Sequence, residues 1–294
     1  MKLKNNIKED TMSVPERLSR ISRLSIRFGG CLLAAVAVLY LTPAVALATN
    51  PLGRPLSEHA ATAGVAPINS HAHGHSYGEW SAMWWQWIYA FPANPPDGLP
   101  NPNFTNGTVD CSDGQSTHDK SNQVWFLAGN FGGTSNRSCT VPTGIALFIP
   151  VLNFENDNIG CCTPTTPPNT FTDAQLRAGA AAAMDNPLAI HARIDNVLVP
   201  VLAYRAQSPP PHFIYSLPAA NNVYLFFNYA FGSEFTLPGY NWPSLNVPAV
   251  SDGYWLMLEP LSPGKHVINF GGITNFGFAL DITYNIDVVP GKGK

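Results

Sequence analysis

Residues 80–91 have large aromatic residues at helical spacing. Four of them lie at positions i, i+4, i+7 and i+11, on a single helical face: Trp80, Trp84, Trp87 and Phe91. Ser76 and Glu79 have the spacing of a capping box, in which each side chain hydrogen bonds to the other residue's backbone N–H. Other apolar residues cover the remaining faces. The pattern predicts a buried helix over residues 78–90, ended by Pro92.

A second helix is predicted over residues 172–185. Thr172 and Gln175 form another capping box, and an alanine-rich run follows them. The sequence Asp185-Asn186-Pro187 ends the pattern, because proline has no backbone N–H and disfavours helix in the residue before it.

From residue 123 onward the pattern changes to short runs of branched and aromatic residues bounded by Gly, Asn or Pro, which predict strands. These runs are 123–128, 145–152, 190–194, 197–204, 223–229, 254–258, 266–270 and 278–289. Two short connections, Asp195-Asn196 and Pro260–Gly264, each predict a hairpin between the runs that flank them. Many short strands with few helices predict an all-β fold, a single β-sandwich or jelly-roll-like domain with two embedded helices.

The N-terminal region has the features of a signal peptide. Residues 31–48 carry no charge, follow a basic segment, and end in Ala46-Leu47-Ala48, a small-x-small cleavage pattern. We therefore predict a signal peptide over 1–48, cleavage after Ala48, and a secreted or periplasmic protein without a membrane span. The run of 18 residues also has the minimum length of a membrane span, so an uncleaved anchor is the alternative. Translation can start at Met1 or at Met12.

Composition divides the rest of the chain into a linker and a domain, and its charge narrows the classes of partner. Residues 49–76 are predicted as a linker rich in Pro and Ala, and 77–294 as the sandwich domain. The whole chain has 16 Lys and Arg and 19 Asp and Glu, but seven of those bases lie in the first 48 residues. Nine scattered bases against sixteen acids remain after them, which excludes a duplex nucleic-acid binder. Small molecules or carbohydrates are the expected partners, and the sequence does not indicate an oligomeric state.

Four cysteines follow the predicted cleavage site, and export permits disulfides. Four cysteines allow three pairings. We favour Cys111–Cys139, which closes a loop with the pattern of a turn followed by paired strands. The adjacent Cys161 and Cys162 can form a strained vicinal disulfide. Their spacing does not match a zinc site.

Several motifs resemble those of a family of exported bacterial proteins of uncharacterised function. They are Tyr77-Gly-Glu-Trp-Ser-Ala-x-Trp-Trp-Gln-Trp87, Val124–Gly129, Arg137-x-Cys139-x-Val-Pro-x-Gly144, Pro150-x-Leu-Asn153, Asp252-Gly-Tyr-Trp255 and Pro260-Leu-Ser-Pro-Gly-Lys-His266. The resemblance spans residues 77–289 and implies one continuous domain in a secreted or periplasmic protein. It implies no catalytic residue.

Three histidines precede the first helix at alternate positions. In an extended segment His71, His73 and His75 point to the same side, so their imidazoles can hold Zn, Cu or Ni. The alternative is a polar lead-in to the helix with incidental metal affinity.

A ligand cleft is predicted beside the tryptophan helix. Glu79 and Gln86 are polar groups among many rings, and with Trp84 they are the predicted ligand-binding residues. Such rings stack on sugars or bury apolar ligands. The alternative is that the rings are core and that Gln86 hydrogen bonds to a neighbouring strand backbone.

Two pairs of acids complete the candidate chemistry. Glu155 with Asp157, and Asp110 with Asp113, can hold calcium or serve glycoside hydrolysis, and solvated loop acids are the alternative. The sequence has no nucleophile elbow, zincin motif or phosphate-binding loop. The expected function is an exported β-sandwich protein that binds a carbohydrate or apolar small ligand. A secreted hydrolase that uses carboxylates or a His-bound metal is the alternative, so enzyme activity stays open.

Overall fold

The structure describes most of the predicted sandwich domain. The computed structural model describes residues 63–93, 101–115, 123–158, 171–218, 221–224, 226 and 247–291. The predicted signal peptide, residues 49–62 of the predicted linker and the Cys161–Cys162 pair lie outside these residues. No helix in the described ranges is long and apolar enough to span a membrane.

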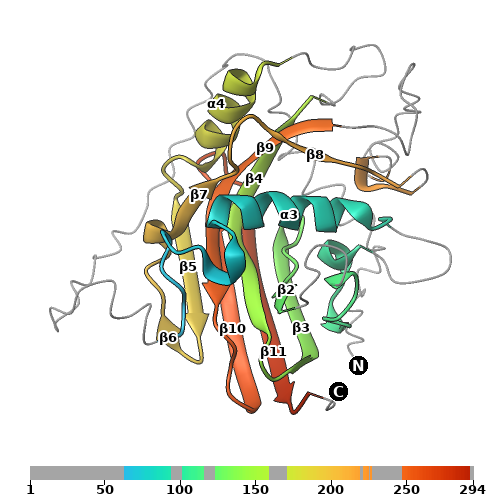
Figure 1. Ribbon diagram of the computed structural model, residues 1–294, viewed down its shortest axis with the longest axis vertical. Coiled ribbons are helices and arrows are strands. Elements are labelled where there is room, and N and C mark those ends of the chain that lie inside the picture. The colour runs from blue at the N-terminus through green and yellow to red at the C-terminus, as the bar shows by residue number, and fades with distance from the viewer. Residues whose placement is uncertain are drawn as a thin grey trace, which may run out of the picture.

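The described chain is mostly strand, arranged in two sheets with two α-helices (Figure 1). The larger sheet has the order β1-β3-β11-β10-β5-β6. Its strands are β1 (Gly107–Thr108), β3 (Gly133–Pro142), β11 (Ala279–Val289), β10 (Gly264–Ile273), β5 (Ala189–Ile194) and β6 (Val197–Leu198). The smaller sheet has the order β2-β4-β9-β7, and β8 also pairs with β9. Its strands are β2 (Val124–Phe126), β4 (Ala146–Asp157), β9 (Val247–Leu258), β7 (Arg205–Gln207) and β8 (Phe213–Tyr215).

Both sheets are mixed. β3 runs parallel to β1 and to β11, β2 runs parallel to β4, and the remaining pairs are antiparallel. The inner faces pack together through the centre of β4 against β10 and β5, and residues of both sheets share one apolar core. These features confirm the predicted all-β, sandwich-like architecture with two helices.

Helix α3 (Tyr77–Ala90) covers the outer face of the smaller sheet and confirms the first predicted helix. The predicted capping box of Ser76 and Glu79 is present. A Cβ atom on Gly78 would lie 2.3 Å from the carbonyl oxygen of Gln207, so this first turn needs glycine to reach β7. Farther along, the Trp84 ring lies 5.7 Å from that of Trp255 on β9. The helix therefore belongs to the core.

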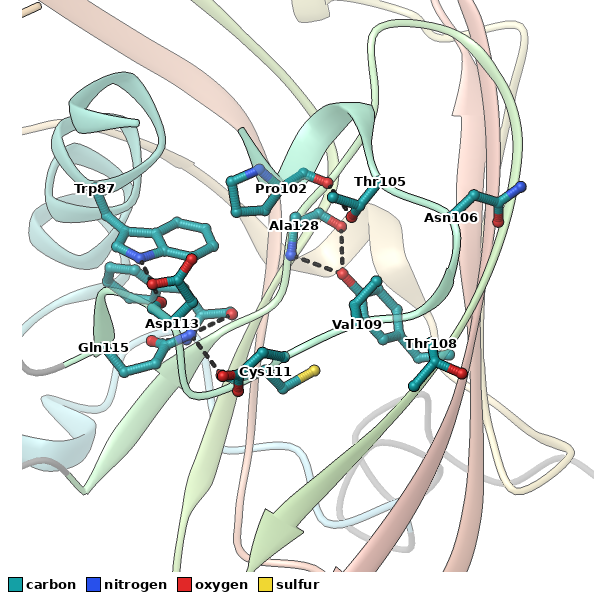
Figure 2. Close-up of a pocket in the computed structure, with 13 residues that line it drawn as sticks. Trp87, Pro102, Thr105, Asn106, Thr108, Val109, Cys111, Asp113, Gln115 and Ala128 are labelled. Atoms are coloured by element: carbon teal, nitrogen blue, oxygen red, sulfur yellow. Dashed lines mark hydrogen bonds between the residues drawn. The ribbon is translucent and has the colours of Figure 1, made fainter. Parts of the chain in front are cut away.

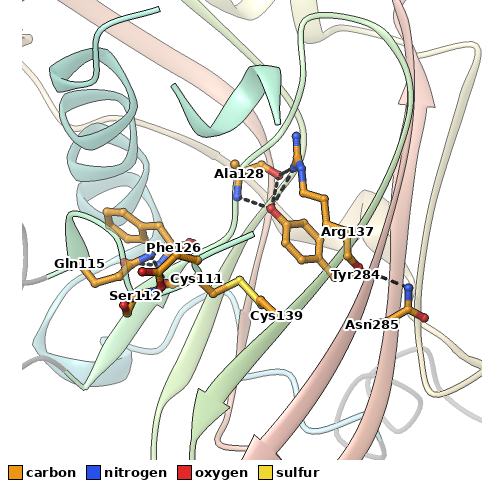
Figure 3. The surroundings of a disulfide bond; sticks show 10 residues. Cys111, Ser112, Gln115, Phe126, Ala128, Arg137, Cys139, Tyr284 and Asn285 are labelled. Atoms are coloured by element: carbon orange, nitrogen blue, oxygen red, sulfur yellow. Dashed lines mark hydrogen bonds between the residues drawn. A yellow bond between two sulfur atoms is a disulfide. The ribbon is translucent and has the colours of Figure 1, made fainter. Parts of the chain in front are cut away.

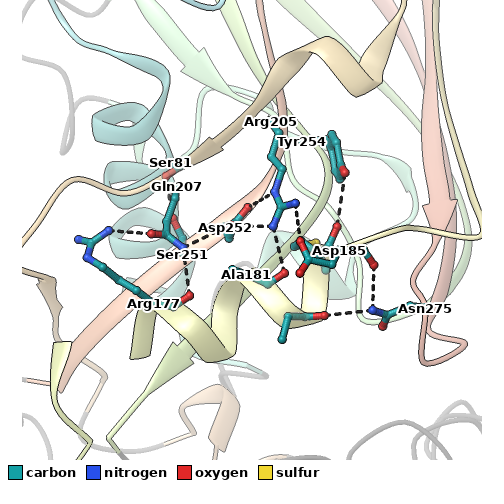
Figure 4. A network of polar contacts seen from close by, with 12 residues as sticks. Ser81, Arg177, Ala181, Asp185, Arg205, Gln207, Ser251, Asp252, Tyr254 and Asn275 are labelled. Carbon is teal, nitrogen blue, oxygen red and sulfur yellow. Dashed lines mark hydrogen bonds and ion pairs between the residues drawn. The ribbon is translucent and has the colours of Figure 1, made fainter. Parts of the chain in front are cut away.

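Helix α4 (Asp173–Met184) confirms the second predicted helix and packs on β9 and β4. Figure 4 shows the polar network that holds its C-terminal end on the sheet. The guanidinium of Arg205 on β7 donates to both carboxylate oxygens of the buried Asp252, at 2.8 and 3.2 Å, and to Asp185 at 2.7 Å. It also donates to the carbonyl of Ala181 at 3.0 Å. One planar cation thus ties two strands to the helix, a role that the fork geometry of arginine suits.

The second predicted hairpin is wrong. Strands β9 and β10 flank the connection Pro260–Gly264 as expected, but β9 pairs with β4 and β10 pairs with β11. The connection therefore crosses between the two sheets. The first predicted hairpin is confirmed as β5 and β6 around Asp195-Asn196, both with positive φ, as a tight hairpin turn requires. Its second arm ends early, because a 3-10 turn, η4 (Val201–Tyr204), follows it.

Two further strand assignments differ. The predicted strand 223–229 is wrong where it is described, since Val223, Tyr224 and Phe226 are helical and the Phe226 amide donates to the Asn222 carbonyl at 3.0 Å. Strand β3 was not predicted, because its inward positions include polar residues: Ser135, Arg137, Cys139 and Val141. These residues hide the alternation of apolar and polar positions from which a strand is read.

Candidate functional site

A pocket of about 290 Å³ lies between the C-terminal half of α3 and the segment 102–115 (Figure 2). The rings of Trp87, Phe126 and Tyr284 contribute to its lining, and Asp110 and Asp113 add two carboxyl groups. Its volume is close to the lower end of the ~300–1,000 Å³ range of ligand sites. The site therefore has room for a small ligand and offers it both apolar and polar contacts.

On the side of the pocket lined by Trp87, helix α3 lies close to the turn that carries Asp113 and Gly114. Trp87 packs edge-on against Phe126 with ring centroids 5.6 Å apart, and its indole N–H donates to the carbonyl of Asp113 at 3.4 Å. Gly114 has φ +65°, and a Cβ atom there would lie 2.9 Å from the indole nitrogen. Only glycine accepts that backbone conformation and that contact without strain. The position of Asp113 beside the Trp87 indole thus depends on glycine at position 114.

The predicted disulfide Cys111–Cys139 is present and fixes this turn to β3 (Figure 3). Gln115 reinforces the attachment. Its amide nitrogen donates to the carbonyls of Cys111 and Phe126, at 3.0 and 2.9 Å, and its oxygen accepts from the Phe126 amide at 2.8 Å. The loop that carries Asp110 and Asp113 is therefore held at both ends.

Tyr284 is held in the pocket wall by Arg137, which is fully buried. The guanidinium lies over the ring at 5.3 Å and donates to the Tyr284 hydroxyl at 2.9 Å. It also donates to the carbonyls of Thr105, Ala128 and Gly129, at 2.8 to 3.0 Å. These bonds engage the cation with neutral acceptors and fix the wall, so Arg137 has a positioning role.

The carboxyl groups dominate the electrostatics of the pocket. Burial raises the pKa of Asp113, and the neighbouring charge of Asp110 adds to this effect. The amide and hydroxyl of Ser112 both donate to Oδ1 of Asp110, at 2.8 and 2.6 Å, which orients that carboxylate. None of the described residues that line the pocket is a Lys, Arg or His. The two carboxyl groups therefore suit ligands with hydrogen-bond donors.

The three predicted ligand residues lie on α3, but none of them is among the described residues that line this pocket. Glu79 completes the capping box, and its hydrogen bonds from Ser76 hold its pKa below the usual value. Trp84 is buried and donates to the Leu127 carbonyl at 2.8 Å. Gln86 donates to the Ile214 carbonyl of β8 at 2.8 Å, which is the contact of the alternative interpretation. A ligand-binding role for these residues stays a prediction.

The histidine segment is not extended as predicted. Ala72–Gly74 form a 3-10 turn, η1, in which His73 has φ +55°. His73 lies 3.4 Å from the carboxylate of Glu259, and the His75 ring packs edge-on against Trp80 at 4.9 Å. In the described ranges, no three His, Cys, Asp or Glu side chains are grouped as metal ligands. Binding of Zn or Cu at His71, His73 and His75 stays a prediction.

The second acidic pair is in a different environment from solvated loop acids. Glu155 and Asp157 lie two residues apart on β4 and accept hydrogen bonds from tyrosine hydroxyls, Glu155 from Tyr89 and Asp157 from Tyr215 and Tyr224. Calcium binding or glycoside hydrolysis by this pair stays a prediction.

Most of the pocket was not evident from the sequence. Asp110 and Asp113 were candidates, but only as members of an acidic stretch. Tyr284 comes from the last strand, and Gln115 from a loop without periodicity, so no local pattern links either residue to Trp87. No family model matches the chain, and a search of curated proteins finds no match.

Proposed function

We propose that this chain is an exported protein that binds a small neutral carbohydrate in the pocket between α3 and the Cys111 loop. The observation that carries the proposal is the composition of the pocket, in which aromatic rings and two carboxyl groups line one cavity.

Carbohydrates match this composition because they have both apolar C–H faces and hydroxyl donors. The apolar C–H groups of a sugar suit the edges of the aromatic rings that line the pocket. Its hydroxyls donate to Asp110 and Asp113, and a hydrogen bond to an ionised acceptor is about twice as strong as a neutral one. An apolar ligand would instead desolvate these carboxyl groups without a partner, which is costly. We therefore favour the carbohydrate over the apolar ligand.

The proposal of export combines two features. The uncharged run at 31–48 with its Ala46-Leu47-Ala48 end has the pattern of a cleaved signal, and the Cys111–Cys139 disulfide supports an oxidising compartment. Mass spectrometry of protein recovered from the producing cell tests the cleavage. A mature chain that begins at Thr49 is expected, and retention of residues 1–48 would contradict it.

Binding is tested by calorimetric titration of the purified domain with a panel of neutral monosaccharides and disaccharides. We expect at least one saccharide to bind, and Asp113→Asn to weaken its binding about tenfold, the effect of losing a charged hydrogen bond of ~1.5 kcal/mol. Asp287→Asn is the matched control, because Asp287 is an exposed acid on β11 that pairs with Lys265. No binding by any saccharide, or equal losses in both variants, would contradict the proposal.

A secreted hydrolase is the second candidate, favoured by the two unlike carboxyl groups in one pocket. The raised pKa of Asp113 suits a proton donor, and the carboxyl group of Asp110, oriented by Ser112, lies in the same pocket. Incubation of wild-type protein with chromogenic glycosides distinguishes the two functions. Turnover that both Asp110→Asn and Asp113→Asn abolish would establish the enzyme, whereas binding without turnover supports the binding protein.

A further inference from the structure

The pocket reaches the edge of the larger sheet. Asn106 and Thr108 line it and are exposed, and Thr108 lies on β1, the edge strand beside β3. Figure 2 shows the Asn106 side chain at this rim, directed away from Trp87. A ligand longer than the pocket can therefore continue past Asn106 onto the surface of the larger sheet.

Three asparagine side chains follow one another across the strands at this rim. The backbone N–H of Asn136 on β3 donates to Oδ1 of Asn106 at 2.7 Å. The side chain of Asn285 on β11 donates to Oδ1 of Asn136 at 2.9 Å and to the carbonyl of Arg137 at 3.3 Å (Figure 3). Asn106, Asn136 and Asn285 are called the amide row below. Because Asn106 also lines the pocket, the row begins where the pocket ends.

The two members of the amide row that lie on strands point to the outer face of the larger sheet. Buried and exposed residues alternate along β3, where Arg137 and Cys139 point to the core and Asn136 is exposed. The same alternation on β11 buries Tyr284 and exposes its neighbour Asn285. Since successive side chains of a strand point to opposite faces, Asn136 and Asn285 lie on one exposed face.

Each side chain of the amide row is held by a hydrogen bond and keeps a second amide atom for a ligand. The Oδ1 atoms of Asn106 and Asn136 are engaged, so their exposed Nδ2 groups can donate. The Nδ2 group of Asn285 is engaged, so its Oδ1 can accept. Side chains that are already ordered lose less conformational freedom when a ligand binds.

This arrangement of donors and acceptors matches a chain of sugars. Each sugar hydroxyl both donates and accepts, as a primary amide does. Adjacent strands lie ~4.8 Å apart, a spacing comparable to the width of a sugar ring. A sugar chain that crosses the strands therefore meets successive amides. A single sugar in the pocket has no contact with Asn136 or Asn285, because neither residue lines the pocket.

We propose that the ligand is a neutral oligosaccharide, with one sugar unit in the pocket and the following units on the amide row. This inference rests on the proposed function, because the pocket supplies the first sugar site. The observation that points to a chain is the continuity of the two surfaces at Asn106, which lines the pocket and accepts from β3. The next unit contacts Asn136, and a further unit contacts Asn285.

Calorimetric titration of the purified protein with sugar chains of increasing length tests this inference. The probes are β-1,4-linked glucose, α-1,4-linked glucose and β-1,4-linked mannose, each from the monosaccharide to the tetrasaccharide. In at least one series we expect the trisaccharide to bind about tenfold more tightly than the monosaccharide, the effect of one or two added hydrogen bonds. A monosaccharide that binds as tightly as its oligomers would overturn this inference alone. Absence of binding in every series would overturn the proposed function with it.

The variant Asn136→Ala assigns the gain with length to the amide row. It removes the outward amide but keeps the backbone N–H that donates to Asn106. We expect unchanged monosaccharide affinity and loss of the roughly tenfold gain. The control Asn269→Ala removes an asparagine from the same sheet face on β10, which β3 and β11 separate from β1, and should keep the gain. A gain that persists in Asn136→Ala, or equal losses in both variants, would overturn the proposal.

Two further measurements keep the test decisive if Asn136→Ala fails to fold. Asn285→Ala should reduce the gain from the longer oligomers and leave that of the disaccharide, because Asn285 lies farther from the pocket. An unchanged gain in Asn285→Ala would count against the row. A neutral Gly-Ser peptide of similar length should not bind; if it bound as tightly as the oligosaccharide, the surface would be a peptide site and the proposal would be overturned.

Discussion

Removal of the Cys111–Cys139 disulfide is expected to destabilise the domain and loosen one wall of the pocket. The bridge joins residues 28 apart in sequence. Closing a loop of that length in the unfolded chain removes about 12 cal/mol/K of entropy, equivalent to about 3.6 kcal/mol at 25 °C. This loss is a large fraction of the ~5–15 kcal/mol by which folded domains are stable.

Local hydrogen bonds are retained when both cysteines become alanine. Gln115 still connects the turn to the backbone of β2, so we expect the double variant to fold. Because the effect acts on the unfolded chain, the dependence of the unfolding free energy on urea should become steeper. Exchange of backbone amides in 107–115 should accelerate, while the β10–β11 pair keeps its protection.

Urea unfolding followed by tryptophan fluorescence measures the effect. We expect the double variant to lose about 3–4 kcal/mol, and a reducing agent to produce the same loss in the wild type but none in the variant. A loss below about 1 kcal/mol would refute the reasoning. An equal response of both proteins to the reducing agent would assign the loss to another site.

Three shorter predictions follow from individual contacts. Gln86→Leu removes the hydrogen bond to β8 and should cost about 0.5–1.5 kcal/mol in urea unfolding, with saccharide titration unchanged. Gly114→Ala should cost about 1–3 kcal/mol and weaken saccharide binding, because its positive φ and its contact with Trp87 are both incompatible with a Cβ atom; wild-type stability would contradict this. Burial lowers the pKa of His266, but its hydrogen bonds, first to Asp195, outweigh this and leave the pKa raised. The pair therefore stabilises fully below the ordinary pKa of about 6.5 and weakens as the pH rises through the raised value. Thermal unfolding should show a weaker dependence in Asp195→Asn, which keeps only the hydrogen bond of His266 with the Ser262 carbonyl.

Local patterns in the sequence predicted the helices more accurately than the strand pairing. Both capping boxes mark helix starts correctly, because a cap is a contact between residues three apart. The connection Pro260–Gly264 has the composition of a hairpin, yet it joins different sheets. Strand β9 pairs with β4, which is remote in sequence, whereas β10 pairs with β11, the strand that follows it. Composition alone does not decide between these partners.

The residues that surround the candidate site were also hard to predict, because they are remote from one another in sequence. Trp87 belongs to a visible helical pattern, but the carboxyl groups that face its pocket come from a loop without periodicity. Glu155 and Asp157 were visible as an acidic pair, but outside the predicted strand 145–152. Their hydrogen-bond donors are Tyr89, Tyr215 and Tyr224, which meet them only in the folded chain. Sequence reasoning therefore identified candidate chemistry without its surroundings.

The most direct test of carbohydrate binding is a nuclear magnetic resonance titration that follows the indole N–H signals of the tryptophans. The Trp87 signal is identified by its absence in Trp87→Phe. On addition of a saccharide that binds, the account predicts that the Trp87 signal shifts progressively, while those of Trp80 and Trp255, which do not line the pocket, stay in place. A bound saccharide that leaves Trp87 unchanged, or no saccharide that shifts it, would contradict the assignment of this pocket.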